Sequence, residues 1–325
     1  MKYLLPLNVE VTKKHISILT PCYNEEGNVS LLVNAVGAVF DRMPQYSYEH
    51  IFIDNCSTDK TAAILKNIAE TNKQVKIIVN ARNFGHIRSP FYGMLQCNGD
   101  AVISLVADFQ DPPEMIEQFL NKWEEGYKIV IGIKKKSKEN PLMFAIRRFF
   151  YSLLSKVSSG GGEQPVQNFT GFGLYDQKFI AVLRTLEDPY PYFRGLITEL
   201  GFDRYEIEYT QPRRAAGKTK NNFFTLYDIA MLGFTNHSKL PLRLSAFLGF
   251  FSATISLLVA IVYFIYKLLY WNRFDVGLAP LVIGVFFFSS VQLFFIGIIG
   301  EYIGAIHTQV RKRPLVIEKE RINFD

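Results

Sequence analysis

Cysteine is scarce in this chain, and the three that occur exclude two classes of site. Cys22, Cys56 and Cys97 have neither the spacing of a zinc site nor that of a redox pair. Their odd number, close to strand-like segments, indicates reduced thiols that face the cytosol. Repeats and low-complexity tracts are also lacking. Met1 to Thr12 has no cationic segment followed by an apolar core, so no secretory signal is predicted.

A strong excess of charge of either sign is lacking too. Lys and Arg together number 36, Asp and Glu number 30, and the net charge is +6. This imbalance is too small to indicate a nucleic-acid partner, but it is compatible with an anionic membrane or with phosphate-bearing ligands. The length of 325 residues predicts about two domains.

Charged residues are absent from two long apolar runs, Leu244 to Tyr266 and Val276 to Gly300. Each run can cross a hydrocarbon core, which needs about 20 apolar residues. The short link between them predicts a transmembrane hairpin whose two ends lie on the same side of the membrane. Gly297, Gly300 and Gly304 allow close helix packing, either within the hairpin or between the protomers of a homo-oligomer.

Basic residues give the orientation of this hairpin. Its loop holds only Lys267 and Arg273, whereas both flanking segments are rich in lysine and arginine. The positive-inside rule therefore places the flanking segments in the cytoplasm. The prediction is a multi-pass protein of the plasma (inner) membrane, with its large N-terminal domain and both termini cytoplasmic.

Strand-like and helix-like segments alternate before the hairpin. Strands are predicted at His15–Thr20, Tyr48–Ile53, Val75–Asn80, Val102–Val106 and Ile129–Ile133, and helices at Val29–Phe40, Lys60–Glu70 and Ser89–Gln96. This order indicates an α/β domain with a parallel sheet. Polar clusters follow four strands, at residues 23–26, 54–59, 82–85 and 108–111. Ligands collect beyond the carboxyl ends of parallel strands, so the clusters predict one composite site.

The last of these clusters has the pattern of a metal-binding turn. Asp108 and Asp111 follow a buried apolar strand, with Gln110 between them and two prolines after them. Such oxygen ligands suit Mg²⁺ or Mn²⁺. A polar turn that binds nothing is the alternative, and the three similar strand ends weigh against it.

A glycine-rich phosphate loop is missing. With neither a G-x-G-x-x-G nor a Walker sequence, a diphosphate would need a metal at Asp108 to neutralise it. Asp54 and Glu25 would then accept hydrogen bonds from a ribose or a base. This combination favours a nucleotide-sugar transferase over a dehydrogenase or an ATPase.

Five motifs, in order, resemble those of the family 2 glycosyltransferases that load polyprenyl phosphates. They are Thr20-Pro-Cys-Tyr-Asn-Glu-Glu, Asp54-x-x-Ser57-x-Asp59-x-Thr61, Arg82-Asn-Phe-Gly, Asp108-Phe-Gln-Asp-Pro-Pro-Glu114 and Arg214-x-x-Gly217-x-Thr219-Lys220. This group includes dolichol-phosphate mannose synthases and GtrB-type bactoprenol glucosyltransferases, and the two-helix hairpin is more similar to the second. The resemblance implies a Rossmann-like, mostly parallel GT-A domain, a nucleotide-diphospho-sugar donor, inversion at the anomeric carbon, and Mg²⁺ or Mn²⁺ as cofactor.

The resemblance also implies roles for individual residues. The nucleotide would be bound by Pro21, Tyr23, Glu25, Asp54, Asp108 and Gln110. Asp108 and Gln110 would hold the metal as well. The predicted catalytic set is Asp108, Asp111 and Arg194, the last near the diphosphate.

Several positions depart from the family pattern. Val106 stands where relatives often carry a second acid, and Thr170-Gly171-Phe172 lacks the acid of a Thr-Gly-Asp motif. The Gly160–Gly162 loop and Ala215 are further departures. No catalytic base can therefore be assigned. A lipid monophosphate does not require one, because its second pKa of about 6 leaves the attacking oxygen largely anionic at neutral pH.

Cations for the acceptor phosphate are predicted in two segments. Arg147 and Arg148 lie in an amphipathic stretch from Pro141 to Val157, and Arg214 and Lys220 lie in a basic loop. Ordinary surface packing remains an alternative for the first segment, and lipid attachment remains one for the second.

The predicted domains are a cytoplasmic catalytic domain (1–220), a juxtamembrane amphipathic segment (221–242), the hairpin (243–303) and a cytoplasmic basic tail (304–325). The predicted function is inverting transfer of glucose from UDP-glucose to a membrane polyprenyl phosphate, for cell-surface glycosylation. A dolichol-phosphate-mannose-type transferase using GDP-mannose is one alternative. A catalytically weak, membrane-anchored nucleotide-sugar binding protein is the other.

Overall fold

The structure is a computed structural model that describes residues 13–135, 166, 168–212, 240–270 and 278–324. The chain forms two compact units. One comprises residues 1–144, 163–220 and 312–325, and the other comprises residues 145–162 and 221–311. Each unit is described by itself below.

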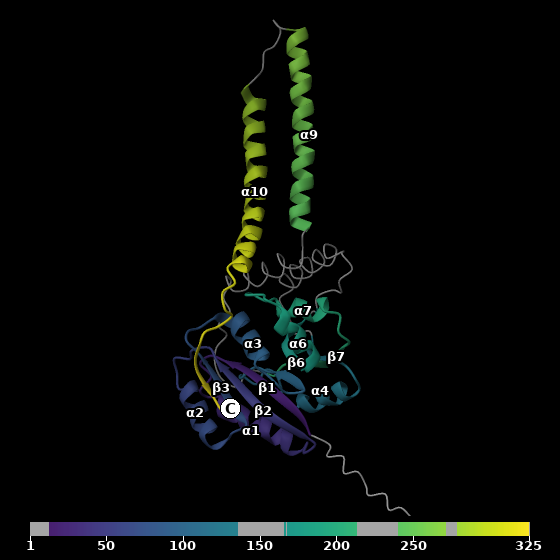
Figure 1. Cartoon of the computed structure of the whole chain (residues 1–325). Coiled ribbons are helices and arrows are strands. Elements are labelled where there is room, and N and C mark those ends of the chain that lie inside the picture. The colour runs from purple at the N-terminus through teal and green to yellow at the C-terminus, as the bar shows by residue number, and fades with distance from the viewer. Residues whose placement is uncertain (1–12, 136–165, 167, 213–239, 271–277, 325) are drawn as a thin grey trace, which may run out of the picture. The chain divides into compact units, whose positions relative to one another are not determined.

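The first unit is an α/β domain built on one eight-stranded sheet (Figure 1). Its elements in chain order are β1 (Lys14–Cys22), α1 (Val29–Asp41), β2 (Tyr46–Asp54), α2 (Thr61–Thr71), β3 (Val75–Asn80), α3 (Gly85–Leu95), β4 (Ala101–Ser104), α4 (Met115–Glu124), β5 (Ile129–Lys134), β6 (Phe169–Asp176), α6 (Gln177–Thr185), α7 (Phe193–Glu199), β7 (Arg204–Tyr209) and β8 (Glu318–Ile322).

The strands lie in the order β7-β5-β6-β4-β1-β2-β3-β8. Strands β1 to β4 are mutually parallel where they pair, and β5 pairs in parallel with β7. Strand β6 is antiparallel to both β4 and β5, and β8 is antiparallel to β3. The prediction of an α/β domain with a mostly parallel sheet is confirmed. The carboxyl ends of β1 to β5 and β7 therefore share one edge of the sheet.

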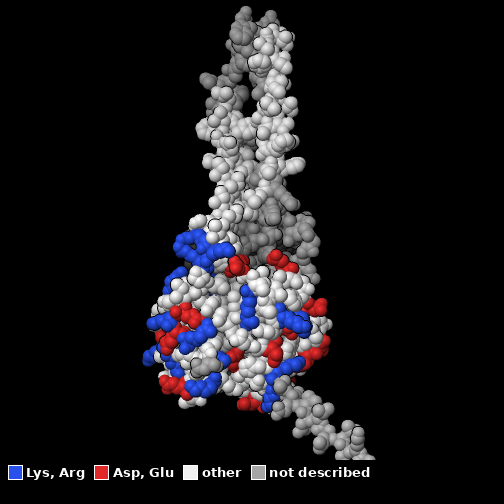
Figure 2. Space-filling view, in the orientation of Figure 1, with Lys and Arg blue, Asp and Glu red and all other residues white. Residues whose placement is uncertain are grey.

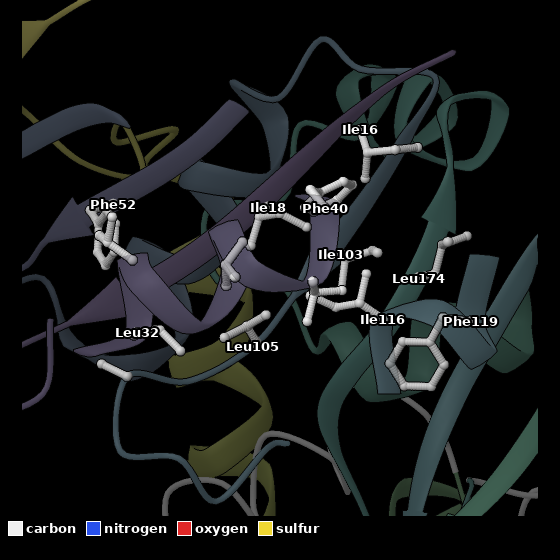
Figure 3. Close-up of a cluster of buried hydrophobic side chains, with 14 of the residues drawn as sticks. Ile16, Ile18, Leu32, Phe40, Phe52, Ile103, Leu105, Ile116, Phe119 and Leu174 are labelled. Atoms are coloured by element: carbon white, nitrogen blue, oxygen red, sulfur yellow. The ribbon is translucent and has the colours of Figure 1, made fainter. Parts of the chain in front are cut away.

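Helices cover both faces of the sheet, which explains the near-continuous apolar sequence of its central strands. On one face, Ile16 and Ile18 of β1 pack in the same cluster as Leu32 of α1 and Phe119 of α4 (Figure 3). On the other face, Leu19 of β1 belongs to a second cluster that contains residues of α3, α6 and α7. The sheet is fixed from both sides, so the loops at its edges start from rigid positions.

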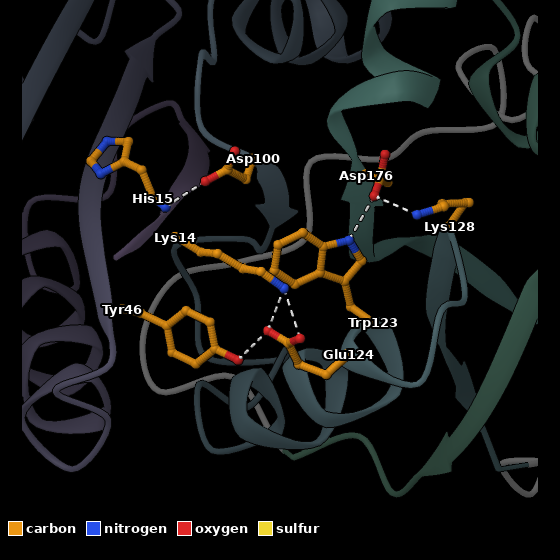
Figure 4. Close-up of polar contacts among 8 residues, drawn as sticks. All are labelled: Lys14, His15, Tyr46, Asp100, Trp123, Glu124, Lys128 and Asp176. Carbon is orange, nitrogen blue, oxygen red and sulfur yellow. Dashed lines mark hydrogen bonds and ion pairs between the residues drawn. The ribbon is translucent and has the colours of Figure 1, made fainter. Parts of the chain in front are cut away.

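A polar cluster ties the elements together at the amino ends of the strands (Figure 4). Lys14 Nζ lies 2.7 Å from Glu124 Oε2 and 4.5 Å from the centroid of the Trp123 ring. Trp123 Nε1 donates a hydrogen bond of 2.8 Å to Asp176, which also accepts from Lys128 at 3.2 Å. Because Asp176 ends the antiparallel strand β6, it lies at the edge opposite the carboxyl ends of β1 to β4.

The interior of the sheet also holds a histidine. His50 on β2 is fully buried, and its Nε2 lies 2.9 Å from Thr20 Oγ1 on β1. Burial disfavours the charged imidazolium and lowers the pKa of His50 from 6.5 to about 3.

Acid should therefore destabilise the protein through His50. Between pH 6.5 and about 3 the unfolded chain binds a proton that the folded chain does not, so stability falls as the pH falls through this window. From pH 8 to pH 5 this term amounts to about 2 kcal/mol. The thermal midpoint of the wild type should fall by several degrees more than that of His50→Gln over the same change. Equal falls in the two proteins would contradict this origin.

The sheet is completed by residues that follow the second apolar helix in the chain. Ala81 N donates a hydrogen bond of 2.9 Å to Ile317 O, just before β8. Asn323 Nδ2, just after β8, donates to Ala69 O at 2.8 Å and to Val75 O at 2.9 Å. Residues 304–325 have the sequence of a basic tail, so this edge strand was not predicted.

The second unit contains two long apolar helices, α9 (Leu240–Leu269) and α10 (Leu278–Val310). Within them, Ala246–Tyr266 and Gly284–Val310 are long and apolar enough to cross a membrane, which agrees with the predicted hairpin. Their described surfaces are almost free of charge, whereas Lys, Arg, Asp and Glu are spread over the sheet-bearing unit (Figure 2). Helix α10 continues beyond Gly300, the predicted end of the second run, as far as Val310.

The glycines of α10 have open space around them. A Cβ added at Gly297, Gly300 or Gly304 would meet no other atom within 4 Å. The homo-oligomer stays a prediction.

Candidate active site

The candidate site lies where β1 to β4 reach their carboxyl ends. The register pairs Cys22, the last residue of β1, with Asp54, the last residue of β2. Leu105, just after β4, donates its backbone N–H to Leu19 O on β1 at 3.0 Å. The four polar clusters of the sequence therefore follow adjacent strands along one edge of the sheet, as predicted.

The loops after β1 and β2 are held together by hydrogen bonds. Asn24 N donates to Ser57 Oγ at 2.9 Å, and Thr58 N donates back to Asn24 Oδ1 at 2.8 Å. Glu25 N donates to Thr61 Oγ1 at 2.8 Å. The second family motif thus fixes the backbone of the first, and it leaves the Glu25 side chain to a separate partner, Asn28 Nδ2, at 2.7 Å.

Asp54 lies at the centre of this pair of loops. Its side chain is only 1% exposed and accepts hydrogen bonds from the Ser57 hydroxyl and from Ser57 N, the latter at 3.1 Å. Burial raises the pKa of Asp54 above its usual range, although the bonds from Ser57 oppose that shift. Burial, together with the charges of Asp54, Glu25 and Asp59, raises the pKa of the neighbouring Cys22 thiol, which stays protonated.

Thr61 is the residue whose loss should loosen both loops. It is fully buried, and its Oγ1 accepts from Glu25 N and donates to Asp59 Oδ1 at 2.5 Å. Although burial raises the pKa of Asp59, bonds from Thr61 Oγ1 and N hold it below its usual range. Thr61→Val should raise the KM for the donor nucleotide about tenfold, because one lost hydrogen bond leaves the Glu25 amide unpaired. Thr61→Ser, which keeps the hydroxyl, should stay within about twofold, and equal KM values in the two variants would exclude the role.

The loop after β3 joins the same network through Asn55. Asn55 Oδ1 accepts from Asn80 Nδ2 at 3.1 Å and from Phe84 N at 2.9 Å, while its Nδ2 donates to Asn83 Oδ1 at 2.9 Å. The sequence did not single out Asn55 or Asn80. It did not single out Ser89 either, whose hydroxyl accepts from Asn80 Nδ2 at 2.9 Å. The signal that could have identified the two asparagines is their position, directly after Asp54 and at the end of the third predicted strand.

The turn after β4 separates its two carboxylates. Asp111 is 3% exposed and accepts from Tyr209 Oη at 3.1 Å and from Val106 N at 3.2 Å. Burial raises the pKa of Asp111 to about 6. Asp108 is 7% exposed, and its Oδ1 accepts from Gln110 N at 3.1 Å. Between them, Phe109 has a left-handed φ of 60°, a strained conformation for a bulky residue.

The described residues hold no cluster of three or more His, Cys, Asp or Glu side chains suited to a metal ion. Asp111 accepts from Tyr209, whereas Asp108 accepts from the backbone N–H of Gln110. Mg²⁺ is often held by one or two carboxylates plus substrate phosphates and water. The oxygen atoms of Asp108 and Gln110 therefore fit a divalent ion whose remaining ligands come from a diphosphate.

The end of β6 that lies at the site carries no carboxylate, because the one acid of this strand is at its other end. Strand β6 is antiparallel to β4, so its first residues, Phe169 and Thr170, lie at the carboxyl edge. Asp176, the acid that ends β6, is at the opposite edge and caps α6 by accepting from Lys178 N at 2.9 Å. Neither position supplies a carboxylate to the site.

The other predicted residues divide into three groups. Pro21 and Tyr23 lie at the end of β1, next to the paired loops. Arg194 lies in the first turn of α7 and is half-buried. Arg147, Arg148, Arg214 and Lys220 lie outside the described residues. The roles assigned to all of these side chains stay predictions.

Comparison with known proteins adds to this geometry. The family model for glycosyl transferase family 2 matches residues 17–178. An uncharacterized glycosyltransferase, YkcC of Bacillus subtilis (strain 168), is 33% identical over 316 residues, 96% of each chain. The bactoprenol glucosyl transferase of Shigella phage SfII is 31% identical over 306 residues, 94% of this chain and 97% of its own. A crystal structure of glucosyl-3-phosphoglycerate synthase from Mycobacterium tuberculosis, with Mn²⁺ and UDP, is 15% identical and covers 67% of this chain and 76% of its own, with a TM-score of 0.46.

Proposed function

The chain belongs to glycosyl transferase family 2, and on that premise we propose that it transfers glucose from UDP-glucose to a polyprenyl phosphate at the cytoplasmic face of the membrane. The chain is a glycosyltransferase, and its sheet has the GT-A-like arrangement. One observation supports the lipid acceptor above all. A relative named bactoprenol glucosyl transferase matches 94% of this chain, a length that includes the two apolar helices as well as the sheet domain.

The proposed reaction makes one bond and breaks one. A phosphate oxygen of the lipid attacks the anomeric carbon of the sugar, the bond from that carbon to the diphosphate breaks, and the nucleoside diphosphate leaves with the bonding electrons. Attack from the opposite face inverts the anomeric configuration. The acceptor oxygen is already largely anionic at neutral pH, since its second pKa is about 6, so the lack of a carboxylate at the site end of β6 is not an obstacle.

The protein would act mainly by positioning. The paired loops after β1 and β2, with Tyr23 and Glu25, would hold the nucleoside, and Asp54 would set their shape. Asp108 and Gln110 would hold the divalent ion, which neutralises charge on the departing diphosphate. Arg194 would add a fixed cation near that charge. Each of these roles follows from position and chemistry and awaits substitution.

The test is transfer of label into lipid. Full-length protein in membranes is incubated with radiolabelled UDP-glucose and undecaprenyl phosphate, with and without EDTA. We expect label in the lipid phase that disappears with the chelator and returns with excess Mg²⁺ or Mn²⁺. Parallel incubations with GDP-mannose and other nucleotide sugars give the donor preference.

Two outcomes would replace the proposal. Label transferred from GDP-mannose but not from UDP-glucose would make the protein a mannose transferase of the dolichol-phosphate type. Nucleotide binding without any lipid product from the donor panel would make it a membrane-anchored binding protein, an alternative suggested by the missing carboxylates at Val106 and near Phe172.

A further inference from the structure

Arg88 is a cation near the candidate site with a buried nitrogen that has no hydrogen-bond partner. It lies in the first turn of α3, which begins directly after the third strand-end loop. Its Nε is buried and has no hydrogen-bond partner. Its guanidinium carbon lies 5.4 Å from the centroid of the Tyr190 ring. A buried guanidinium N–H without an acceptor is costly, which points to an acceptor supplied from outside the chain.

Arg88 has no ion-pair partner within the described part of the chain. Among the described residues, neither Arg88 nor Arg194 forms an ion pair with a carboxylate, in contrast to Lys128, which pairs with Asp176. The first turns of α3 and α7 contain no acid either. An anion bound beside either arginine would form a charge-assisted hydrogen bond with it and would therefore be stabilising.

Helices α3 and α7 are brought together by aromatic packing. The centroids of the Phe91 and Phe193 rings lie 6.3 Å apart. Phe91 is about one helical turn after Arg88 on α3, so this contact is next to the contact of Arg88 with Tyr190. Arg194 follows Phe193 directly. Both arginines are therefore carried by one packed pair of elements, rather than by mobile surface loops.

This region is also linked to the donor-binding loops. Gly85, where α3 begins, accepts a hydrogen bond of 3.2 Å from Asn55 Nδ2 through its carbonyl oxygen. Ser89, beside Arg88, accepts from Asn80 at 2.9 Å. Asn55 follows Asp54 and Asn80 ends β3, so the turn that carries Arg88 is fixed by the same side chains that order the carboxyl edge.

We propose that Arg88, with Arg194, binds a phosphate oxyanion of one of the two substrates. The shared chemistry is a charge-assisted hydrogen bond from a guanidinium to phosphate, and its source is either the diphosphate of the donor or the monophosphate of the lipid. This inference rests on the proposed function for the identity of those substrates. The role of Arg88 itself is binding and does not include proton transfer.

The test separates charge from packing. Arg88→Met keeps a hydrocarbon side chain against Tyr190 but removes the charge, Arg88→Lys keeps the charge but loses the buried Nε, and Arg42→Ala removes an exposed arginine that follows α1 at the opposite edge of the sheet. UDP and farnesyl monophosphate are titrated separately into each full-length protein by calorimetry. We expect Arg88→Met to weaken one of the two ligands by about tenfold to a hundredfold, Arg88→Lys to recover part of the loss, and Arg42→Ala to match the wild type.

The pattern of losses identifies the source of the phosphate. Weaker UDP binding with a raised donor KM assigns Arg88 to the diphosphate, whereas weaker farnesyl phosphate binding with a raised acceptor KM assigns it to the lipid. Unchanged binding of both ligands to Arg88→Met would overturn the inference, as would equal weakening by Arg42→Ala. Because the titrations need no turnover, failure of sugar transfer by the wild type would refute the proposed function and leave this result readable.

Discussion

Asp108→Asn is expected to lower kcat by about a hundredfold to a thousandfold. Asparagine keeps the shape of the side chain and can still accept the bond from Gln110 N, which is 3.1 Å long in the wild type. It removes the negative charge of Asp108, which is the charge proposed to hold a divalent ion. The loss should be accompanied by a higher concentration of Mg²⁺ or Mn²⁺ for half-maximal rate, measured with the full-length protein.

Asp111→Asn is the matched comparison, because it makes the same chemical change three positions away. Asp111 is buried and bonded to Tyr209 and to Val106 N, so its replacement should lower the thermal midpoint. The metal concentration for half-maximal rate should change much less than in Asp108→Asn. Retained turnover and unchanged metal dependence in Asp108→Asn would exclude the proposed metal role, whatever Asp111→Asn does.

Removal of residues 314–325 is expected to unfold the sheet domain or to make it aggregate. The deletion would strip β3 of its antiparallel partner and remove the buried Val316 and the packing of Leu315, Ile322 and Phe324. Val316 is worth about 1.5–3 kcal/mol and the three partly buried side chains add less each, so the loss is a large fraction of the stability of an ordinary domain. Gel filtration in detergent and limited proteolysis of the sheet domain measure the outcome.

Asn323 provides a finer version of the same test. It has a left-handed φ of 60°, and its side chain donates to two backbone carbonyls. Asn323→Gly loses the two bonds but tolerates the φ, whereas Asn323→Ala also incurs backbone strain of about 1 kcal/mol. The thermal midpoint should therefore be highest for the wild type, lower for Asn323→Gly and lowest for Asn323→Ala. A truncated protein that stays monodisperse with a wild-type midpoint would show that β8 is dispensable.

The part of this fold that could be predicted is the part whose signal is local. The strands from β1 to β5 contain apolar runs, the first four of which end in polar clusters, and the two membrane-length helices are uncharged runs. Strand β8 reads Glu-Lys-Glu-Arg-Ile, which is typical of a solvated tail, and it becomes a strand only through pairing with β3. Its charges suit an edge strand, because they prevent further pairing.

In the site, too, only the features with a local sequence signal could be predicted. The sequence placed Asp108 and Asp111 in one metal-binding turn, but the partner that separates their roles is Tyr209, which lies 98 positions further along the chain than Asp111. The asparagines that join the loops were also missed, because a buried amide has the sequence appearance of an ordinary turn residue. Arg88 is a third case, since its lack of a partner is visible only after folding.

The position of β8 in the chain has a consequence for biosynthesis. The ribosome makes β3 long before it makes β8, and both apolar helices lie between them in the sequence. A nascent chain therefore carries an open sheet edge, held by chaperones or by its own collapse, until the hairpin has been translated. Ala81, which pairs with the segment before β8, is followed directly by the third strand-end loop of the candidate site. Folding of the sheet domain is thus ordered in time, with synthesis of the two apolar helices first and completion of the sheet edge last.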